Sequence, residues 1–236
     1  MNSIIASTST LYGSTFLAYL QDPLQVLFKG VEELIFIPYA RPGGISHDAY
    51  TQKAQEGLSP LNIKVRGLHE FNDPKQALAK AQALFTGGGN TFVLLNQLYQ
   101  QDLLSTLKKA ILEGTPYLGT SAGSNICGKS IMTTNDMPIV YPPSFESMGI
   151  LPFNLNPHYL DPDPNSTHNG ELRETRIQEY HAYNTPAVVG LREGSWIRLE
   201  GNECRLQGPL SARIFQAGKQ PYELEAGASL AGLANI

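Results

Sequence analysis

Short, continuous apolar runs alternate with segments of helical periodicity through the first half of the chain. The clearest run is Leu34-Ile35-Phe36-Ile37, which is apolar at every position, as expected for a strand that is covered on both faces. Strands that alternate with helices form mostly parallel sheets with helices on both faces. The sequence therefore predicts an α/β fold, with strands at residues 4–6, 34–37, 63–65, 83–86 and 115–118 and helices at 15–29, 46–58, 74–82, 91–98 and 102–113.

The last third of the chain has a different pattern. A helix is predicted at 171–182 and an apolar strand at 187–191, whereas 196–200 and 212–215 alternate polar and apolar residues and are predicted to pair as an antiparallel hairpin. We expect this hairpin to extend the same sheet. A length of 236 residues with 42% hydrophobic residues suits one α/β domain, so a single domain is predicted over residues 1–236.

The composition restricts the partners and the compartment of the protein. A formal net charge of −4 gives no basic surface for nucleic acid. The two cysteines, Cys127 and Cys204, have no metal-ligand spacing and are typical of a reducing compartment. The chain has neither a signal-peptide pattern nor an apolar run long enough for a membrane helix. We therefore expect a cytoplasmic protein, a monomer or a small homo-oligomer, without membrane or nucleic acid partners.

A glycine-flanked serine follows the predicted strand at 115–118. Residues 119–123, Gly-Thr-Ser-Ala-Gly, fit the G-x-S-x-G pattern of a nucleophile elbow, in which Ser121 stands on a sharp turn between a strand and a helix. The glycines leave room for the crowded turn, and N–H groups of the next helix face any oxyanion formed beside the serine. Because the chain contains 22 glycines, the alternative is a glycine-rich turn with a surface serine.

A serine hydroxyl becomes a strong nucleophile only when a base, usually histidine, takes its proton. His158 follows Asn156-Pro157, and the proline restricts its own backbone and that of the residue before it. A stiffened segment suits a catalytic base; the alternative is a hydrogen-bonded loop histidine. Of the other histidines, two lie upstream and two lie in or beside a polar helix, where a solvated surface role is expected: His47, His69, His168 and His181.

Two carboxylates can orient this base. Asp136, in Thr-Thr-Asn-Asp-Met-Pro, gives the order Ser, Asp, His that is found in α/β-hydrolases. Glu193 gives the order Ser, His, Glu and lies directly after the predicted strand at 187–191. Both residues also fit ordinary turn chemistry, so the residues alone leave the acid open.

Together these segments resemble the peptidase E family of serine peptidases, the aspartyl dipeptidases. The most specific segment is Thr-Thr-Asn-Asp-Met-Pro, whereas residues 141–147 and the tail after about residue 222 depart from the family pattern. The resemblance implies a sheet related to that of the class I glutamine amidotransferases, in a flavodoxin-like arrangement. The matching segments occur in the family's order at residues 87–92, 119–125, 133–140, 156–158, 170–174 with 176–177, and 190–196.

The resemblance also implies roles for individual residues. It implies a catalytic triad of Ser121, His158 and Glu193, with Asp136 in a supporting role near the site. A small peptide is the implied substrate, hydrolysed through an acyl-enzyme without a metal. The oxyanion hole is implied to consist of two backbone N–H groups, those of Gly89 and Ala122.

The family cleaves dipeptides that begin with aspartate, which implies a pocket for a small carboxylate. Guanidinium groups bind carboxylates in a bidentate manner. Arg173 and Arg176, three residues apart on the predicted helix, can share a face, where they repel each other unless an anion lies between them. Arg173 is the stronger candidate, and Asn90 is a further substrate-binding candidate. The alternative is a surface helix whose arginines pair with Glu174 and Glu179.

Two other functions share parts of this pattern. An α/β-hydrolase esterase would use Asp136 as the acid, and a non-catalytic amidotransferase-like binding module would keep the glycine loop, Gly87 to Asn90, with a buried or misplaced His158. No metal or other cofactor is expected, because the chain lacks H-E-x-x-H and close Cys/His spacings, and because residues 87–90 lack the G-x-G-x-x-G spacing of dinucleotide-binding loops.

Overall fold

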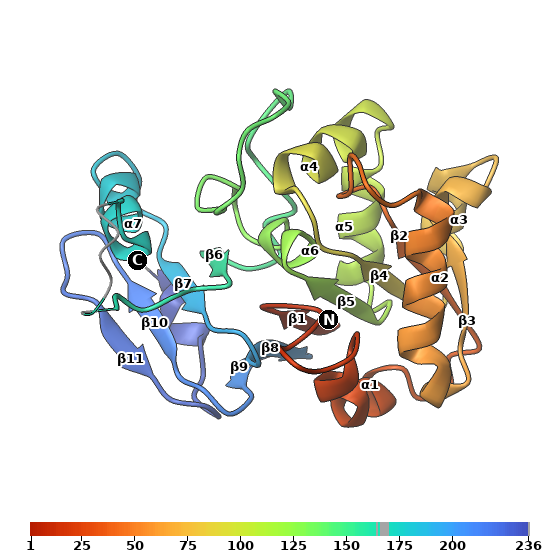
Figure 1. Cartoon of the computed structure of the whole chain (residues 1–236), viewed down its shortest axis with the longest axis horizontal. Helices are drawn as coiled ribbons and strands as arrows, with labels where there is room; N and C mark the ends of the chain where they lie inside the picture. The colour runs from red at the N-terminus through yellow and green to blue at the C-terminus, as the bar shows by residue number, and fades with distance from the viewer. Residues whose placement is uncertain (164, 166–169, 236) are drawn as a thin grey trace.

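The main sheet of the protein is mostly parallel (Figure 1). The structure, a computed structural model, describes residues 1–163, 165 and 170–235. Within these residues, seven strands form the sheet in the order β3 (Lys64–Gly67), β2 (Glu33–Ile37), β4 (Leu84–Thr86), β5 (Tyr117–Thr120), β1 (Asn2–Ala6), β8 (Trp196–Glu200) and β9 (Glu203–Gln207). Strands β1 to β5 pair in parallel, while β8 and β9 pair antiparallel. The predicted fold class is confirmed.

Helices cover both faces of the main sheet, which explains the continuous apolar runs. Successive strand residues point to opposite faces. Ile4 of β1 belongs to the buried cluster beneath α1 (Gln21–Leu27) and α2 (His47–Leu58). Ile5 belongs to the cluster beneath α3 (Pro74–Lys80), α4 (Thr91–Gln100) and α5 (Leu104–Leu112). Full burial of such a side chain stabilises the fold by roughly 1.5–3 kcal/mol. In the described part of the chain, no helix is long and apolar enough to cross a membrane.

Two helices begin at capping residues that the sequence predicts. The side-chain oxygens of Ser46 and Asp73 each accept a hydrogen bond from a backbone N–H in the first turn, at 3.1 and 3.0 Å. Pro74 follows at the first helical position of α3, where its missing N–H costs nothing. A cap of this kind typically contributes about 1 kcal/mol to stability.

A second sheet is built from the chain after residue 153. Its strands lie in the order β11 (Tyr222–Leu224), β10 (Ala212–Phe215), β7 (Val188–Leu191) and β6 (Asn154–Pro157), of which β6 and β7 are parallel. Helix α7 (Arg173–His181) packs on this sheet through Ile177. This side chain forms a small buried cluster with Tyr159, Val188 and Phe215. Figure 1 shows this second sheet and α7 on the left, beside the main sheet.

The predicted hairpin between 196–200 and 212–215 is wrong. Strand β8 instead pairs with β9, and residues 212–215 form β10 of the second sheet. Gly201-Asn202 connects β8 to β9, and Gly201 has a φ of 57°. A two-residue loop with glycine at positive φ matches the twist of a tight hairpin, so it selects the nearer partner. The C-terminal extension of the main sheet is therefore the β8–β9 hairpin alone.

The carboxyl ends of neighbouring parallel strands meet at one edge of the main sheet. The register pairs Ala6 with Thr120 and Thr86 with Gly119, so β1, β4 and β5 end side by side. The next residues along the chain, Ser7, the glycine loop and Ser121, are consequently brought together. Ligands of parallel sheets bind at this edge.

Candidate active site

Ser121 stands on a sharp turn between β5 and the short helix α6 (Ala122–Asn125). Its backbone angles, φ 53° and ψ −109°, lie outside the regions that residues with a Cβ prefer, and such strain costs on the order of 1–3 kcal/mol. A Cβ at Gly119 would lie 2.6 Å from the carbonyl oxygen of Gly123, and one at Gly123 would lie 2.2 Å from that of Thr86. The turn therefore requires both glycines, as the elbow pattern predicts.

His158 follows β6 of the second sheet, and its ring meets Ser121 at the junction of the two sheets. Its Nε2 lies 3.0 Å from Oγ of Ser121. The backbone of His158 also has a positive φ, 55°, and its N–H donates a hydrogen bond to Oγ of Ser7 at 2.8 Å. The Ser7 hydroxyl in turn donates to the carbonyl oxygen of Leu191 at 2.7 Å. This buried serine after β1 thus ties the histidine to both sheets.

Glu193 lies in the turn that leads from β7 of the second sheet to β8 of the main sheet. Its Oε1 lies 2.5 Å from Nδ1 of His158. A carboxylate at this position accepts the Nδ1 proton and leaves Nε2 free to accept the proton of Ser121. The turn is closed by a hydrogen bond from the N–H of Ser195 to the carbonyl oxygen of Arg192 and by Gly194 at a φ of 92°.

Arg192 fixes the turn from the other side. Its guanidinium donates hydrogen bonds to both carboxylate oxygens of Asp161, at 2.8 and 2.6 Å, and to both of Glu223, at 2.8 and 3.0 Å. Hydrogen bonds from Arg192 hold the pKa of both carboxyl groups below their ordinary values. Sequence reasoning missed this cluster, since no local pattern joins three residues so far apart in the chain.

The carboxylate of Asp136 accepts hydrogen bonds at the N-terminus of α4. Its Oδ2 accepts hydrogen bonds from the N–H of Thr91 at 2.8 Å, from the Thr91 hydroxyl at 2.6 Å and from the Thr134 hydroxyl at 3.1 Å. A carboxylate is favourable at the positive end of a helix. Among the described residues it makes no hydrogen bond to His158, whose Nδ1 contacts Glu193 instead.

The glycine loop after β4 passes close to Ser121. A Cβ on Gly88 would lie 3.0 Å from Cβ and 3.5 Å from Oγ of Ser121. Gly89 has a φ of 144°, and a Cβ there would lie 2.3 Å from the carbonyl oxygen of Ala40. Among the described residues, the N–H groups of Gly89 and Ala122 have no hydrogen-bond acceptor. These two N–H groups, one in the glycine loop and one directly after the serine, are thus available as hydrogen-bond donors.

A model of peptidase family S51 matches residues 3–207. The chain belongs to peptidase family S51. Peptidase E of Streptomyces coelicolor is 47% identical over 236 residues, which cover 100% of this chain and 96% of the relative. The Drosophila melanogaster protein named "Probable alpha-aspartyl dipeptidase" is 46% identical over 226 residues, 94% of this chain and 93% of the relative. The predicted resemblance is confirmed.

The fold of this S51 member is found in solved structures. The crystal structure of a peptidase from an acI-B1 Actinobacterium matches with a TM-score of 0.66, covering 97% of this chain and 96% of that chain. The two sequences are 16% identical, so the likeness concerns the fold.

Both polar atoms of the Asn90 side chain make hydrogen bonds within this S51 site. Its Oδ1 accepts a hydrogen bond from the N–H of Val93 and caps α4, and its Nδ2 donates to the carbonyl oxygen of Met137 at 2.9 Å. Asn90 therefore links the glycine loop to the segment after Asp136.

Arg173 and Arg176 lie in the first turn of α7, as the sequence predicts. Burial lowers the pKa of Arg173, the neighbouring Arg176 lowers it further, and the charge of Glu193 opposes this shift. Arg176 forms an ion pair with Glu171, with Nε 3.6 Å from Oε2. Glu174, an expected partner of these arginines, pairs with Arg213 instead. Arg173 is thus a half-buried cation within electrostatic range of Glu193.

The other histidines of the S51 chain are occupied elsewhere. His47 and His69 pack against each other with ring centroids 5.2 Å apart, and Nε2 of His69 lies 2.7 Å from Asp48. His181 is half-buried rather than solvated, with Nε2 3.1 Å from the carbonyl oxygen of Pro186. His168 lies outside the described residues.

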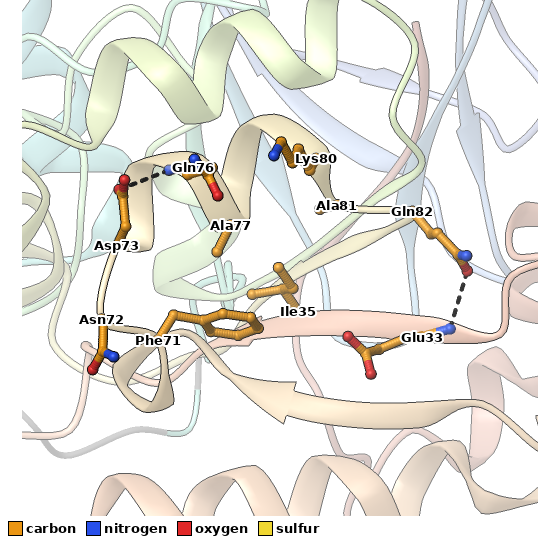
Figure 2. A pocket seen from close by; sticks show the side chains of 10 residues that line it. All are labelled: Glu33, Ile35, Phe71, Asn72, Asp73, Gln76, Ala77, Lys80, Ala81 and Gln82. Atoms are coloured by element: carbon orange, nitrogen blue, oxygen red, sulfur yellow. Dashed lines mark hydrogen bonds between the residues drawn. The ribbon is translucent and has the colours of Figure 1, made fainter.

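A pocket beside α3 is separate from the triad. Figure 2 shows Phe71, Ile35 and Ala77 lining it, with polar residues around them. Two of those polar side chains are already paired, because Asp73 caps α3 and the Gln82 amide oxygen accepts the N–H of Glu33. The pocket shares no residue with the site at Ser121.

Proposed function

We propose that the protein is a serine peptidase that hydrolyses dipeptides with N-terminal aspartate through an acyl-enzyme on Ser121. The observation that carries this proposal is the continuous chain of contacts from Ser121 through His158 to Glu193, with distances of 3.0 and 2.5 Å. The name of the Drosophila melanogaster relative, probable alpha-aspartyl dipeptidase, supports the substrate class.

In the proposed reaction, His158 Nε2 takes the proton of Ser121 as Oγ attacks the carbonyl carbon of the aspartyl residue. Glu193 stabilises the imidazolium that forms. The oxyanion accepts hydrogen bonds from the N–H groups of Gly89 and Ala122, each of which typically contributes about 3 kcal/mol to the transition state. The C–N bond then breaks as His158 protonates the leaving amine. In the second half, His158 takes a proton from water as the water oxygen attacks the acyl carbon, and it returns this proton to Oγ of Ser121 as the ester bond breaks and aspartate leaves.

Arg173 is the proposed partner of the substrate's aspartyl side chain, with Arg176 in support. The charged form of Arg173 is disfavoured by its partial burial and by repulsion from Arg176. A carboxylate bound between the two guanidinium groups offsets both effects. Asp136 is proposed to act at a distance, by holding the start of α4 and, through Asn90, the segment around Met137.

A panel of four dipeptides, Asp-Leu, Asn-Leu, Glu-Leu and Ala-Leu, tests the substrate class. We expect kcat/KM for Asp-Leu to exceed that for the isosteric Asn-Leu by at least about 10²-fold, because the amide leaves the half-buried cation of Arg173 unpaired. A fluorophosphonate should label the protein and stop turnover, whereas a chelator should not. Equal turnover of Asp-Leu and Asn-Leu would contradict the aspartyl preference, and inhibition by the chelator alone would contradict the serine mechanism.

Arg173→Gln should raise KM for Asp-Leu by roughly 10- to 100-fold while changing kcat much less, since a charged hydrogen bond to the substrate contributes about 1.5–3 kcal/mol. The matched control is Arg205→Gln, which removes an exposed arginine that pairs with Glu203 and should leave both constants unchanged. Steady-state kinetics with Asp-Leu and Asn-Leu provide the readout. An unchanged KM with Asp-Leu would assign the carboxylate pocket to another residue.

The two alternatives find less support in the geometry. A non-catalytic module would leave His158 buried or misplaced, yet its side chain is 36% exposed and hydrogen-bonded to Ser121. An esterase built on Asp136 would need that carboxylate at Nδ1 of His158, whereas its hydrogen bonds go to Thr91 and Thr134. We also propose a cytoplasmic location, which the free thiols of Cys127 and Cys204 support.

A further inference from the structure

The middle of the glycine loop is held by two side chains outside the triad. The carbonyl oxygen of Gly88 accepts a hydrogen bond from the Tyr50 hydroxyl at 2.9 Å and another from the Nε–H of Arg41 at 3.2 Å. Arg41 also lies over the Tyr50 ring, with its guanidinium carbon 5.4 Å from the ring centroid. These two donors come from the segment after β2 and from α2, on one side of the loop.

A run of three glycines needs such an anchor. Glycine adopts positive and negative φ almost equally, so the peptide between Gly88 and Gly89 has little intrinsic preference for either of its two orientations. In a trans peptide the C=O and N–H point in opposite directions. Holding the Gly88 carbonyl toward Tyr50 therefore turns the Gly89 N–H away from Tyr50.

The ends of the loop are fixed by the backbone, but its middle is not. The N–H of Gly87 donates to the carbonyl oxygen of Ile37 at 3.3 Å, and the N–H of Asn90 donates to that of Ala40 at 2.7 Å. Gly88 lies within contact distance of Ser121, because a Cβ built on it would be 3.0 Å from the serine Cβ. The orientation of the 88–89 peptide beside the nucleophile thus depends on side chains.

Tyr50 is suited to this task. Its side chain is 2% exposed, and its ring meets Phe36 edge-on with centroids 4.9 Å apart. Burial raises the pKa of the Tyr50 hydroxyl, so it keeps its proton and remains a donor throughout the neutral range. A rigid donor in an apolar wall fixes its acceptor more firmly than an exposed group does.

We propose that Tyr50, supported by Arg41, is a positioning residue for the oxyanion hole: it anchors the Gly88 carbonyl so that the Gly89 N–H faces the oxyanion formed at Ser121. The inference rests on the proposed acyl-enzyme chemistry, but not on the identity of the substrate. When this anchor is lost, the peptide can rotate and present a carbonyl oxygen to the developing negative charge.

Tyr50→Phe tests the role, because it removes the donor and keeps the ring against Phe36. We expect kcat for an aspartyl dipeptide to fall about 10-fold with KM within about 2-fold of wild type, since one oriented donor is weakened only in the transition state. The matched control is Tyr99→Phe, which removes a hydroxyl that donates to the carbonyl oxygen of Glu146 and should keep wild-type kcat. Thermal unfolding checks that both variants are folded.

The rate at which a fluorophosphonate labels Ser121 gives a second readout that needs no peptide substrate. We expect slower labelling of Tyr50→Phe, and slower still when the exposed Arg41 is also replaced, in Tyr50→Phe/Arg41→Met. If Asp-Leu is not cleaved but labelling slows in this order, the substrate class fails and the positioning role stands. If folded Tyr50→Phe and Arg41→Met both keep wild-type kcat and labelling rates, the positioning role is overturned. A change in KM alone would overturn it as well.

Discussion

Ser121→Ala should abolish turnover of an aspartyl p-nitroanilide, with a loss of kcat of at least about 10⁴-fold, because among the described residues Ser121 carries the hydroxyl that is hydrogen-bonded to Nε2 of His158. Residual activity would come only from the oxyanion donors acting on water. The fold should persist, since the alanine keeps the Cβ of the strained turn and, in the part of the chain that the structure describes, the Ser121 hydroxyl is hydrogen-bonded to His158 alone.

Ser124→Ala is the matched control for this variant. Its hydroxyl lies one turn further along α6 and donates to the carbonyl oxygen of Ala6 at 2.6 Å, and it makes no hydrogen bond to His158 or Glu193 among the described residues. We expect it to lose about 1 kcal/mol of stability and to keep activity within a few-fold of wild type. Fluorophosphonate labelling should vanish in Ser121→Ala and remain in Ser124→Ala. Retained turnover in Ser121→Ala would remove the serine from the mechanism.

Glu193→Gln should lower kcat by roughly 10³- to 10⁴-fold, because the amide can donate to Nδ1 of His158 and so favour the tautomer whose Nε2 cannot accept a proton. Asp136→Asn should cost only a few-fold in kcat. It should lower the melting temperature more than Glu193→Gln does, because Asp136 accepts three hydrogen bonds at the start of α4 and Glu193 is exposed.

The two variants are expected to rank in opposite order in two measurements: Glu193→Gln has the larger loss of kcat, and Asp136→Asn has the larger loss of melting temperature. Stopped assays with saturating substrate give kcat, and calorimetry gives the melting temperature. If Asp136→Asn were the slower enzyme at equal folding, the orienting acid would be Asp136 and the Ser, Asp, His order of the α/β-hydrolases would apply.

Hydrophobic periodicity and helix-capping residues are sufficient to predict most of the strands and helices of the main sheet. The apolar runs predict the parallel strands because burial on both faces excludes polar residues, and Ser46 and Asp73 mark helix starts because only short polar side chains cap well. The pairing of β8 with β9 depends on the Gly201-Asn202 turn, a local feature that the alternation of polar and apolar residues along the strands does not reveal.

The site residues likewise fall into those that local sequence patterns indicate and those that only the tertiary structure brings into place. Ser121 and the glycine loop each follow a predicted strand, and the parallel pairing of β4 with β5 brings them together. The choice between Asp136 and Glu193 stayed open because both fit turn chemistry, and only the crossing from β7 to β8 brings Glu193 to the ring of His158. Ser7, Tyr50 and Arg192 were missed, since a hydroxyl or guanidinium that bonds a distant backbone or carboxylate has no sequence signature.

Ser121 and His158, the proposed nucleophile and base, belong to different sheets, and this division has a mechanical consequence. Ser121 is carried by the main sheet and His158 by the second, with the Ser7 hydroxyl bonded to the second sheet at both His158 and Leu191. A slide of one sheet past the other by about 1 Å would break a 3.0 Å hydrogen bond while leaving each sheet intact. In the proposed mechanism, proton transfer from Ser121 to His158 therefore requires the two sheets to keep their relative position, so the contact between the sheets sets the reactivity of Ser121.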